Sequence, residues 1–353
     1  MAERPHDPAL DKDFASANGW DAGFETFDDF DLPTYVGPST FAKLPWITDP
    51  DELRRRNVDV AIVGAPFDDA VSHRPGTRFG PRAIREAQYT SGSLHSLQLD
   101  VDPFEVLTVV DAGDANIVPS WIERGHAMIY RKVREVAATG AIPIILGGDH
   151  SITWPAATAI AETRRPGTIG IVHFDAHADT ANDGWGVLAS HGTPMRRLIE
   201  SGAVKGSNFV QVGLRGYWPP KETFAWMQEQ GLRYHFMTEI EERGAEAVIK
   251  DAIAEALDGP DSIYLSIDID VIDPGMAPGT GTPEPGGMLT REVLRAIRQI
   301  VGAVDLAGMD IVEVSPPYDQ AETTAMAANR CALEAISALA LRRQAGGRVR
   351  WEG

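Results

Sequence analysis

Short apolar runs rich in valine and isoleucine alternate along the chain with stretches in which apolar residues recur at helical spacing. The apolar runs predict strands at residues 58–64, 104–111, 141–148, 167–175, 208–214, 232–237, 261–268 and 306–314. The intervening stretches predict helices at residues 81–88, 121–138, 239–257, 290–301 and 322–342. Nearly continuous apolar strands that alternate with helices are typical of a parallel sheet covered on both faces. The pattern therefore predicts an α/β fold.

Residues 1–35 break this regular pattern. They are rich in aspartate and glycine, and Trp20, Phe24, Phe27 and Phe30 are scattered among them. Such a segment is either a poorly ordered arm or, as the aromatic residues favour, a partly ordered arm that packs on the body or on a neighbouring subunit. Residues 36–353 contain no repeat, linker or low-complexity block, so we expect a single α/β domain there.

Histidine and carboxylate residues directly follow four of the predicted strands. Parallel strands end at one edge of their sheet, and ligands bind beyond that edge, so these side chains should lie close together. Carboxylates packed so closely repel one another unless cations compensate them, and metal ions are the simplest compensation. The residues concerned are Asp149 and His150, then Asp175, His177 and Asp179, then Asp268 and Asp270, and finally Glu313.

The spacing of these residues indicates two metal ions. Alternate side chains at an extended strand end share a face, so the acidic and histidine residues of each strand end can converge. Six ligands exceed what a single catalytic zinc uses, and four carboxylates balance two divalent cations. Mixed oxygen and imidazole ligands favour Mn²⁺ first, with Ni²⁺, Co²⁺ or Zn²⁺ as alternatives. The ligands so predicted are His150, Asp175, His177, Asp179, Asp268 and Asp270.

Three motifs, GGDHS (147–151), DAHAD (175–179) and DIDVIDP (268–274), each follow a predicted strand in this order. The set resembles the three signatures of the ureohydrolases, the family of arginase, agmatinase, guanidinobutyrase and formiminoglutamase. The resemblance covers roughly residues 35–342, and the segments DLPTYVGPSTFAKLP and HRPGTRFGPRAIR are most similar to agmatinases. It implies a three-layer α/β/α sandwich around an eight-stranded parallel sheet, an architecture shared with metal-dependent deacetylases.

The resemblance also implies a role for each site residue. The six predicted ligands match those of the family's two metals, and Asp179 would also accept a hydrogen bond from the bridging hydroxide. His191, in SHGTP, resembles a proton shuttle on the active-site rim. Glu313, in DIVEVSPP, matches the carboxylate that grips the guanidinium group of the substrate, and Thr282, in GTGTPE, matches a wall of the pocket.

The resemblance leaves the substrate open. In arginase an aspartate after the G-L-R strand end receives the α-amino group of arginine, whereas Gly216 stands there in VGLRGYWPP. This departure favours a substrate without the α-amino acid head, such as agmatine or guanidinobutyrate. Of these we expect agmatine, which would be hydrolysed to urea and putrescine. Guanidinobutyrate hydrolysis and the hydrolysis of guanidine or a biguanide are the alternatives. Nearby, Tyr217 and Trp218 either line the pocket mouth or pack against their own loop.

Composition restricts the partners and the compartment. The formal net charge of −19 argues against binding to nucleic acid or to an anionic membrane, and it suits a cationic guanidino substrate. Cys331 is the only cysteine, which favours a reducing compartment. The polar N-terminal residues do not resemble a signal peptide, and no apolar run has the length of a membrane span. We therefore expect a cytoplasmic protein, and the resemblance implies a homotrimer or homohexamer.

Three rival function classes agree less well with the sequence. A binuclear phosphoesterase would be expected to carry G-D-x-x-D and G-N-H segments, and neither is present. A deacetylase uses one zinc ion, for which six ligands are too many. A non-enzymatic subunit of a ureohydrolase assembly would be expected to have lost ligands, and all six are retained.

Several residues close to the motifs are expected to have structural roles. We interpret His173 as a core histidine with a backbone partner, and Asp149 and Asp273 as turn residues or as supports for the ligands. His73 is expected to be a surface loop residue, and Cys331 a small core residue.

Overall fold

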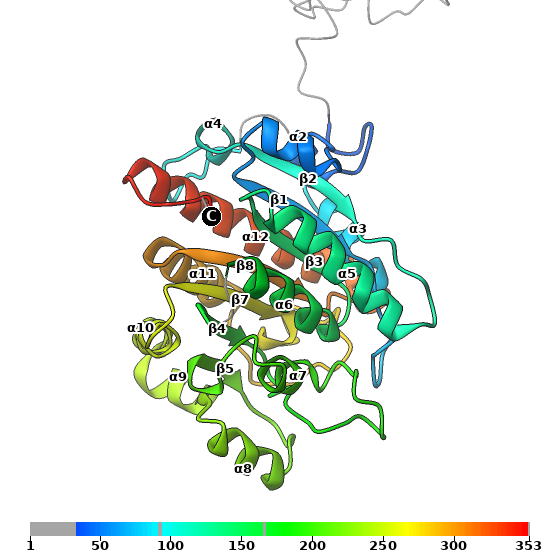
Figure 1. Ribbon diagram of the computed structural model, residues 1–353, viewed down its shortest axis with the longest axis vertical. Coiled ribbons are helices and arrows are strands. Elements are labelled where there is room, and N and C mark those ends of the chain that lie inside the picture. The colour runs from blue at the N-terminus through cyan, green and yellow to red at the C-terminus, as the bar shows by residue number, and fades with distance from the viewer. Residues whose placement is uncertain (1–32, 91–93, 165–166, 352–353) are drawn as a thin grey trace, which may run out of the picture.

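The sheet consists of eight parallel strands. The computed structural model describes residues 33–90, 94–164 and 167–351. Within them the strands lie in the order β2-β1-β3-β8-β7-β4-β5-β6 (Figure 1). Most strands are buried along their whole length, which explains why their sequences are apolar without alternation. The strands are β1 Val60–Ala65, β2 Val109–Asp114, β3 Ile142–Gly147, β4 Ile169–Phe174, β5 Phe209–Leu214, β6 Arg233–Phe236, β7 Ser262–Asp268 and β8 Leu306–Val312.

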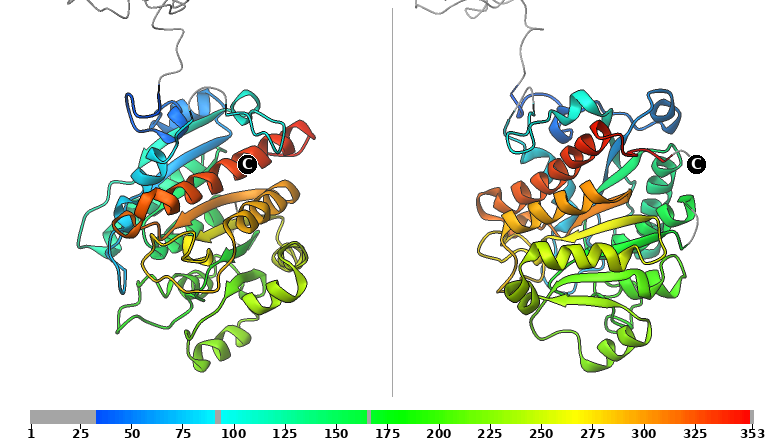
Figure 2. Two further views of the ribbon diagram at one scale, coloured as in Figure 1. Left: turned by 180° about the vertical axis from the view of Figure 1, so that it is seen from behind. Right: turned by 90° about the vertical axis from the view of Figure 1, so that its left-hand side faces the viewer.

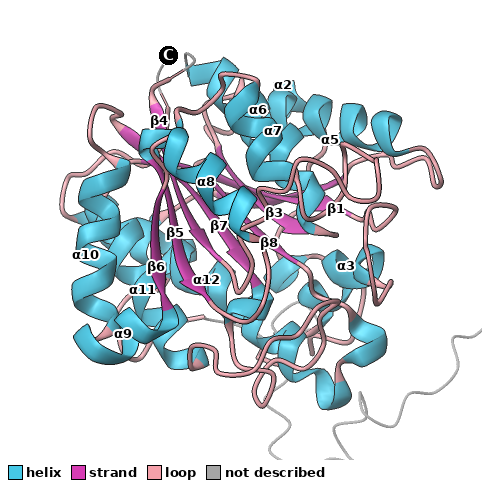
Figure 3. Cartoon of the chain, turned by 90° about the horizontal axis from the view of Figure 1, so that it is seen from below, coloured by secondary structure: helices cyan, strands magenta, loops and turns pink. Residues whose placement is uncertain are grey.

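Helices cover both faces of the sheet, so the predicted three-layer α/β/α sandwich is confirmed (Figures 2 and 3). One face shares its core with α3 Gly80–Glu86, α4 Pro103–Val106, α9 Met237–Arg243, α10 Ala245–Ala256, α11 Thr290–Ala303 and α12 Thr323–Gln344. The other face shares its core with α2 Pro50–Arg55, α5 Ile122–Ala137, α6 Thr153–Arg164, α7 Pro194–Glu200 and α8 Lys221–Glu229. Among the described residues, no helix combines the length and the apolar composition needed to cross a bilayer.

All eight predicted strands are present, but one predicted strand begins too early and one predicted helix is interrupted. Residues 103–106 form α4 instead of the start of β2, because Pro103 and the side chain of Asp102 favour a helix start. The Asp102 carboxylate accepts a hydrogen bond from the Phe104 N–H at 3.0 Å. The predicted helix 239–257 is two helices, because Gly244 adopts φ 82° and breaks the helical backbone between α9 and α10.

The spacing of apolar residues along the sequence did not predict α2, α4, α6, α7 or α8. The longest of these, α6, lies against α5 and α7 on the sheet. It is buried on nearly all sides, so it lacks a polar face that would produce an amphipathic pattern. Of the predicted arm, residues 1–32 lie outside the described residues.

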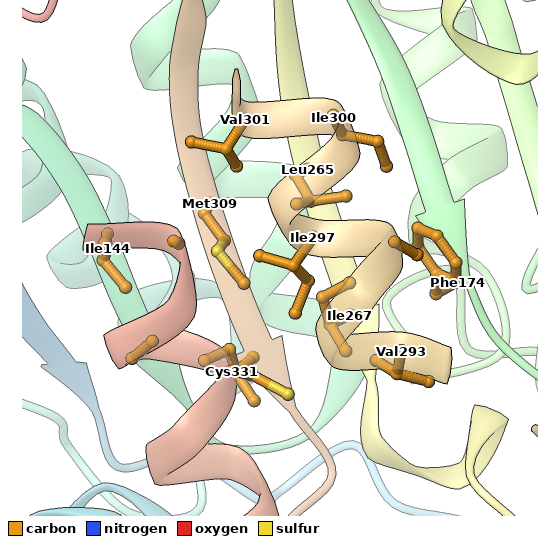
Figure 4. Packing of buried hydrophobic residues seen from close by; sticks show 14 of the residues in the cluster. Ile144, Phe174, Leu265, Ile267, Val293, Ile297, Ile300, Val301, Met309 and Cys331 are labelled. Carbon is orange, nitrogen blue, oxygen red and sulfur yellow. The ribbon is translucent and has the colours of Figure 1, made fainter. Parts of the chain in front are cut away.

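The core beneath α11 and α12 is closely packed (Figure 4). Ile297 of α11 and Cys331 of α12 are fully buried, as are Leu265 and Met309 of the sheet. Burial, with a smaller contribution from Glu334, raises the pKa of the Cys331 thiol to about 12. The thiol therefore stays protonated, and the prediction of a small core cysteine is confirmed.

Candidate active site

The four strands that the sequence singled out are neighbours at the centre of the sheet. The order β3-β8-β7-β4 places the residues after each of them along one continuous edge (Figure 1). Residues as distant in sequence as His150 and Glu313 thereby come into contact, and the His150 N–H donates to Glu313 Oε1 at 2.7 Å. This adjacency is what gathers the predicted site residues.

A first group of potential metal ligands surrounds His150. Its Nδ1 lies 3.1 Å from Asp175 Oδ2, 3.1 Å from Asp179 Oδ2 and 2.9 Å from Asp268 Oδ2. All four residues are buried or nearly so. One imidazole nitrogen and three carboxylate oxygens, all within 4.8 Å of one another, could hold one divalent ion.

The tautomer of His150 is set by a hydrogen-bonded chain behind it. Ser266 Oγ donates to Asp310 Oδ1 at 2.7 Å, and Tyr264 donates to Asp310 Oδ2 at 2.6 Å. Ser266 Oγ therefore accepts from His150 Nε2, 3.0 Å away, so that Nε2 carries the proton. The lone pair of Nδ1 then points at the three carboxylates, as a metal ligand requires.

A second group shares one residue with the first. His177 Nδ1 lies 3.0 Å from Asp270 Oδ2 and 3.5 Å from Asp175 Oδ1. Asp175 thus presents Oδ2 to the first group and Oδ1 to the second. A carboxylate with one oxygen in each group can bridge two ions, which is the arrangement of a binuclear centre.

The side chains themselves indicate that this cluster needs cations. His150 Nδ1 is buried and has no hydrogen-bond partner among the described residues, although it faces three carboxylates. Burial, followed by the charges of Asp270 and Asp175, raises the pKa of Asp268 well above its usual value. Burial opposes a charge on His177, but Asp270 and Asp175 outweigh it and raise its pKa to about 12. Divalent ions would replace such protons, so the six residues fit two metal ions.

His173 was expected to have a backbone partner, and this prediction is wrong. Its Nε2 lies 2.8 Å from Asp175 Oδ2, and its Nδ1 accepts a hydrogen bond from Gln211 Nε2 at 3.0 Å. Because both ring nitrogens are occupied, His173 holds Asp175 in place and leaves no lone pair for a metal.

The two acidic neighbours of the motifs have the supporting roles expected of them. Asp149 accepts hydrogen bonds from the N–H groups of Ser151 and Ala70, both at 3.0 Å. Asp273 accepts from Gly275 at 2.8 Å and from Gly286 at 2.9 Å. Asp149 therefore ties the β3 end to the loop after β1, and Asp273 closes the loop after β7.

Two candidate site carboxylates have strained backbones. Asp179 has φ 52° and Glu313 has φ 63°, which is the left-handed region. This conformation costs a non-glycine residue on the order of 1 kcal/mol, and it persists where the surroundings enforce it. The Glu313 N–H donates to the Gly148 carbonyl at 2.9 Å, and the Asp179 carbonyl accepts from Met195 at 3.1 Å. Strain of this kind gathers at functional sites.

A cavity of about 440 Å³ opens onto the two groups. His177, Asp179 and Asp268 form part of its wall, so a molecule in the cavity would reach the candidate metal positions. The remaining lining residues are Ser72, Ala181, Asp183, Gly184, Trp185, Ser190, His191, Gly192, Thr193, Trp218 and Thr282. The predicted substrate contacts His191, Trp218 and Thr282 are thus on the wall, and the Trp218 ring centroid lies 6.1 Å from that of His177.

Glu313 is not a wall residue but lies directly behind the wall. Its Oε1 accepts from the His150 N–H and lies 3.0 Å from His191 Nδ1. Its Oε2 is buried and has no partner among the described residues. A methyl group added at Gly281, next to the wall residue Thr282, would lie 3.3 Å from this oxygen. The unpartnered carboxylate oxygen thus lies close to the cavity wall, and a buried charge without a partner favours a cation beside it.

Gly216 occupies a position that no other residue fits easily. Its φ is 79°, and an added Cβ would lie 2.7 Å from Glu284 Cδ. The left-handed backbone therefore favours glycine, and any side chain at this position would have to displace the flexible end of Glu284. Gly216 is not part of the cavity wall.

Sequence reasoning missed Ser72, Asp183 and Trp185 of the wall. Asp183 and Trp185 lie in a loop just beyond the DAHAD motif, and that position is the one signal that could have suggested them. Ser72 precedes the HRPGTRFGPRAIR segment by one residue, but no pattern links it to the strand ends. Ser266 and Asp310 lie within apolar strands, where a polar residue could have been suspected of supporting the site.

Comparison with known proteins agrees with this geometry. The model of the arginase family matches residues 58–337. Guanidinopropionase from Pseudomonas aeruginosa is 38% identical over 319 residues, 90% of this chain and 96% of that protein. Agmatinase from Chromobacterium violaceum is 36% identical over 321 residues, 89% and 92% of the two chains. The structure of proclavaminate amidinohydrolase from Streptomyces clavuligerus is similar with a TM-score of 0.80 and 36% identity, covering 88% of this chain and 99% of that one. The chain therefore belongs to the arginase family, the ureohydrolases, and is an enzyme of that family.

Proposed function

We propose that the protein hydrolyses agmatine to urea and putrescine at a binuclear metal centre held by His150, Asp175, His177, Asp179, Asp268 and Asp270. The observation that carries the choice of agmatine is the charge of the cavity wall. Apart from the candidate metal ligands, its one carboxylate is Asp183, and the described wall contains no lysine or arginine. The wall thus suits the primary ammonium group of agmatine and offers no strong partner for a carboxylate tail.

The chain's own residues would bind the guanidinium and move protons. Two divalent ions, if held by the six ligands, would lower the pKa of a bound water and so supply hydroxide at neutral pH. Glu313 Oε2 pairs with the guanidinium group and orients its carbon, which is a poor electrophile because resonance spreads its charge. His191, on the wall beside Glu313, is the source of the proton that the leaving amine requires. Thr282 and Trp218 bound the space for the methylene chain.

The metal we propose is Mn²⁺. Four of the six ligands are carboxylates and two are imidazoles, and no thiolate is among them. Oxygen-rich sites suit manganese, and imidazole ligands also admit nickel, cobalt or zinc. Elemental analysis of protein purified without added metal would distinguish these ions.

The first prediction concerns substrate choice. A urea-release screen should show at least tenfold higher kcat/KM for agmatine than for arginine, a difference of about 1.4 kcal/mol. Neither Gly216 nor the Glu284 carboxylate beside it lies on the cavity wall, and the described wall offers no lysine or arginine for the α-carboxylate of arginine. If arginine is the best substrate, the argument from Gly216 is wrong.

A second arm of this screen tests Asp183. Asp183→Asn should raise KM for agmatine roughly tenfold or less, since the side chain is exposed and solvent screens it. The amide oxygen can still accept the hydrogen bond that Gly186 N donates to Asp183 Oδ1 at 2.8 Å, so the loop should keep its shape. Guanidinobutyrate is the internal control, because its carboxylate tail cannot pair with Asp183 and its KM should therefore not rise. An equal loss on both substrates would mean that Asp183 does not select the tail.

A guanidino acid is the second candidate substrate. The relative named guanidinopropionase is 38% identical to this chain, so family membership alone does not determine the tail of the substrate. Hydrolysis of guanidine or a biguanide, and a non-enzymatic role within a ureohydrolase assembly, are further alternatives. The complete set of six ligands argues against the last of these. The same screen, extended to guanidinopropionate, guanidinobutyrate and guanidine, distinguishes them.

We also propose a cytoplasmic homotrimer or homohexamer. Two large apolar side chains are exposed on the loop that contributes Asp183 to the cavity wall: Trp185 is 85% exposed and Leu188 is 56% exposed. Neighbouring exposed apolar groups mark contact surfaces, and a second copy of the chain would cover them. Light scattering at micromolar concentration should give three or six chains per particle, and a monomer would contradict the proposal.

A further inference from the structure

The loop between β1 and α3 is held rigidly beside the cavity. It includes most of the HRPGTRFGPRAIR segment, to which the proposed chemistry gives no role. Asp149 accepts from the Ala70 N–H at 3.0 Å, and Asp68 accepts from the Gly76 N–H at 2.8 Å. Arg78 forms ion pairs with Asp68 and Asp69. The loop is therefore a fixed scaffold, and a residue on it can position a side chain of the site.

This loop holds His191 at both its backbone and its ring. The His191 N–H donates to the Ala70 carbonyl at 3.1 Å. His191 Nε2 lies 3.0 Å from the Ser72 N–H nitrogen and 2.6 Å from Ser72 Oγ. On the other side of the ring, Nδ1 lies 3.0 Å from Glu313 Oε1. Every polar atom of the imidazole thus has a partner.

These contacts determine where the proton of the neutral ring resides. A backbone N–H can only donate, so Nε2 accepts from Ser72 and Nδ1 carries the proton toward the Glu313 carboxylate. If a second proton bound to Nε2, the hydrogen bond from the Ser72 N–H would break, and the new N–H group would need an acceptor. Ser72 Oγ supplies it, because a hydroxyl both donates and accepts.

Ser72 is also placed to pass a proton onward. Both Ser72 and His191 belong to the cavity wall, but Ser72 is exposed, whereas His191 is only 8% exposed. The His191 nitrogens are both engaged, one with Glu313 and one with Ser72. A proton that leaves Nε2 toward the cavity would therefore pass to the Ser72 hydroxyl first.

We propose that Ser72 relays the proton from His191 to the leaving amine. His191 Nε2–H gives its proton to Ser72 Oγ while the Oγ–H bond breaks and that proton passes to the amine nitrogen. Ser72 ends as a neutral hydroxyl, the imidazole ends neutral with its proton on Nδ1, and the amine leaves in its protonated form as the carbon–nitrogen bond breaks. The relay rests on the proposed function, in which His191 supplies this proton.

The test compares Ser72→Ala with Ser72→Thr, which keeps the hydroxyl. In Ser72→Ala, kcat for agmatine should fall at least tenfold, while KM changes less than about twofold. The solvent deuterium isotope effect on kcat should rise, because proton delivery then becomes slower than the other steps. Ser72→Thr should stay within about threefold of the wild type. Metal content should not change in either variant, and His73→Ala, an exposed neighbour on the same loop, is the matched control.

A direct readout of the ring does not need activity. In zinc-loaded protein labelled with ¹⁵N-histidine, the His191 resonances are identified by their absence in His191→Asn. At a pH high enough to leave the ring neutral, they should show the Nδ1–H tautomer in the wild type. Ser72→Ala should shift the Nε2 resonance, because the hydroxyl donor is gone, whereas His73→Ala should not.

The outcomes separate the relay from the proposed function. If the wild type releases no urea from any guanidino compound, the proposed function fails, and the relay fails with it. If it does release urea, the relay is overturned by a Ser72→Ala enzyme with kcat within twofold of the wild type. It is also overturned if Ser72→Thr is as slow as Ser72→Ala, or if the Ser72→Ala loss comes with loss of metal, since either would indicate a structural role.

Discussion

Replacing Asp175 with asparagine should remove both metal ions and lower urea release at least a thousandfold. Asp175 presents one oxygen to each ligand group, and it is the residue that the two groups have in common. The amide carries no charge, so both ions would lose an anionic ligand in a buried site where charge balance matters. Elemental analysis and a urea assay on the same sample measure the two effects together.

A matched variant makes this prediction sharper. Asp270 belongs to the second group alone, so Asp270→Asn should lower the metal content toward one ion per chain, with a smaller loss from the first group. Asp100→Asn makes the same chemical change at a side chain that is 96% exposed and remote from the site, and it should keep two ions. Two tightly held ions in Asp175→Asn would contradict a bridging role for this carboxylate.

The fold and the metal ligands follow largely from local features of the sequence. A strand buried on both faces must be apolar, so β3, β4, β7 and β8 are visible as runs of valine, isoleucine and leucine. A polar residue directly after such a run leaves the core at the edge where ligands bind. His150 and Asp175 were therefore recognisable as site residues from their positions alone.

The order of the strands could not be read in this way. Nothing in the sequence near β8 indicates that it lies between β3 and β7, yet this position brings Glu313 against His150 and His191. The same holds for Ser72, whose contact with His191 spans 119 positions of the chain. Local pattern predicts which residues leave the core, and only the tertiary packing decides which of them meet.

The supporting residues behind the ligands are the other part that sequence reasoning missed. His173 was interpreted as a core residue because it lies inside a strand, and it is fully buried. Its partner is nevertheless Asp175, two residues along the same strand end. Ser266 and Asp310 likewise sit within apolar strands and fix the tautomer of His150 from behind. A polar residue in a buried strand must find a polar partner, and next to a metal site that partner is the ligand.

Replacing Glu313 with glutamine should lower kcat/KM about a hundredfold for every guanidino substrate, a loss of about 2.7 kcal/mol. The amide oxygen can still accept from the His150 N–H, so the backbone contact survives. The amide nitrogen, in contrast, would place a donor at the Oε2 position, where the carboxylate oxygen is now buried and has no partner among the described residues. A guanidinium group is itself only a donor, so an attractive charged pair becomes a repulsive contact.

The loss should be the same for agmatine, guanidinobutyrate and arginine, because the guanidinium is the group that they share. Two metal ions should remain, since Glu313 belongs to neither ligand group. Glu246→Gln, on the exposed surface of α10, is the control and should behave as the wild type. A loss of kcat/KM for one substrate alone would mean that Glu313 contacts the tail of that substrate. A fall in metal content would mean that Glu313 supports the metal centre. Either result would overturn the role of Glu313 as the partner of the guanidinium.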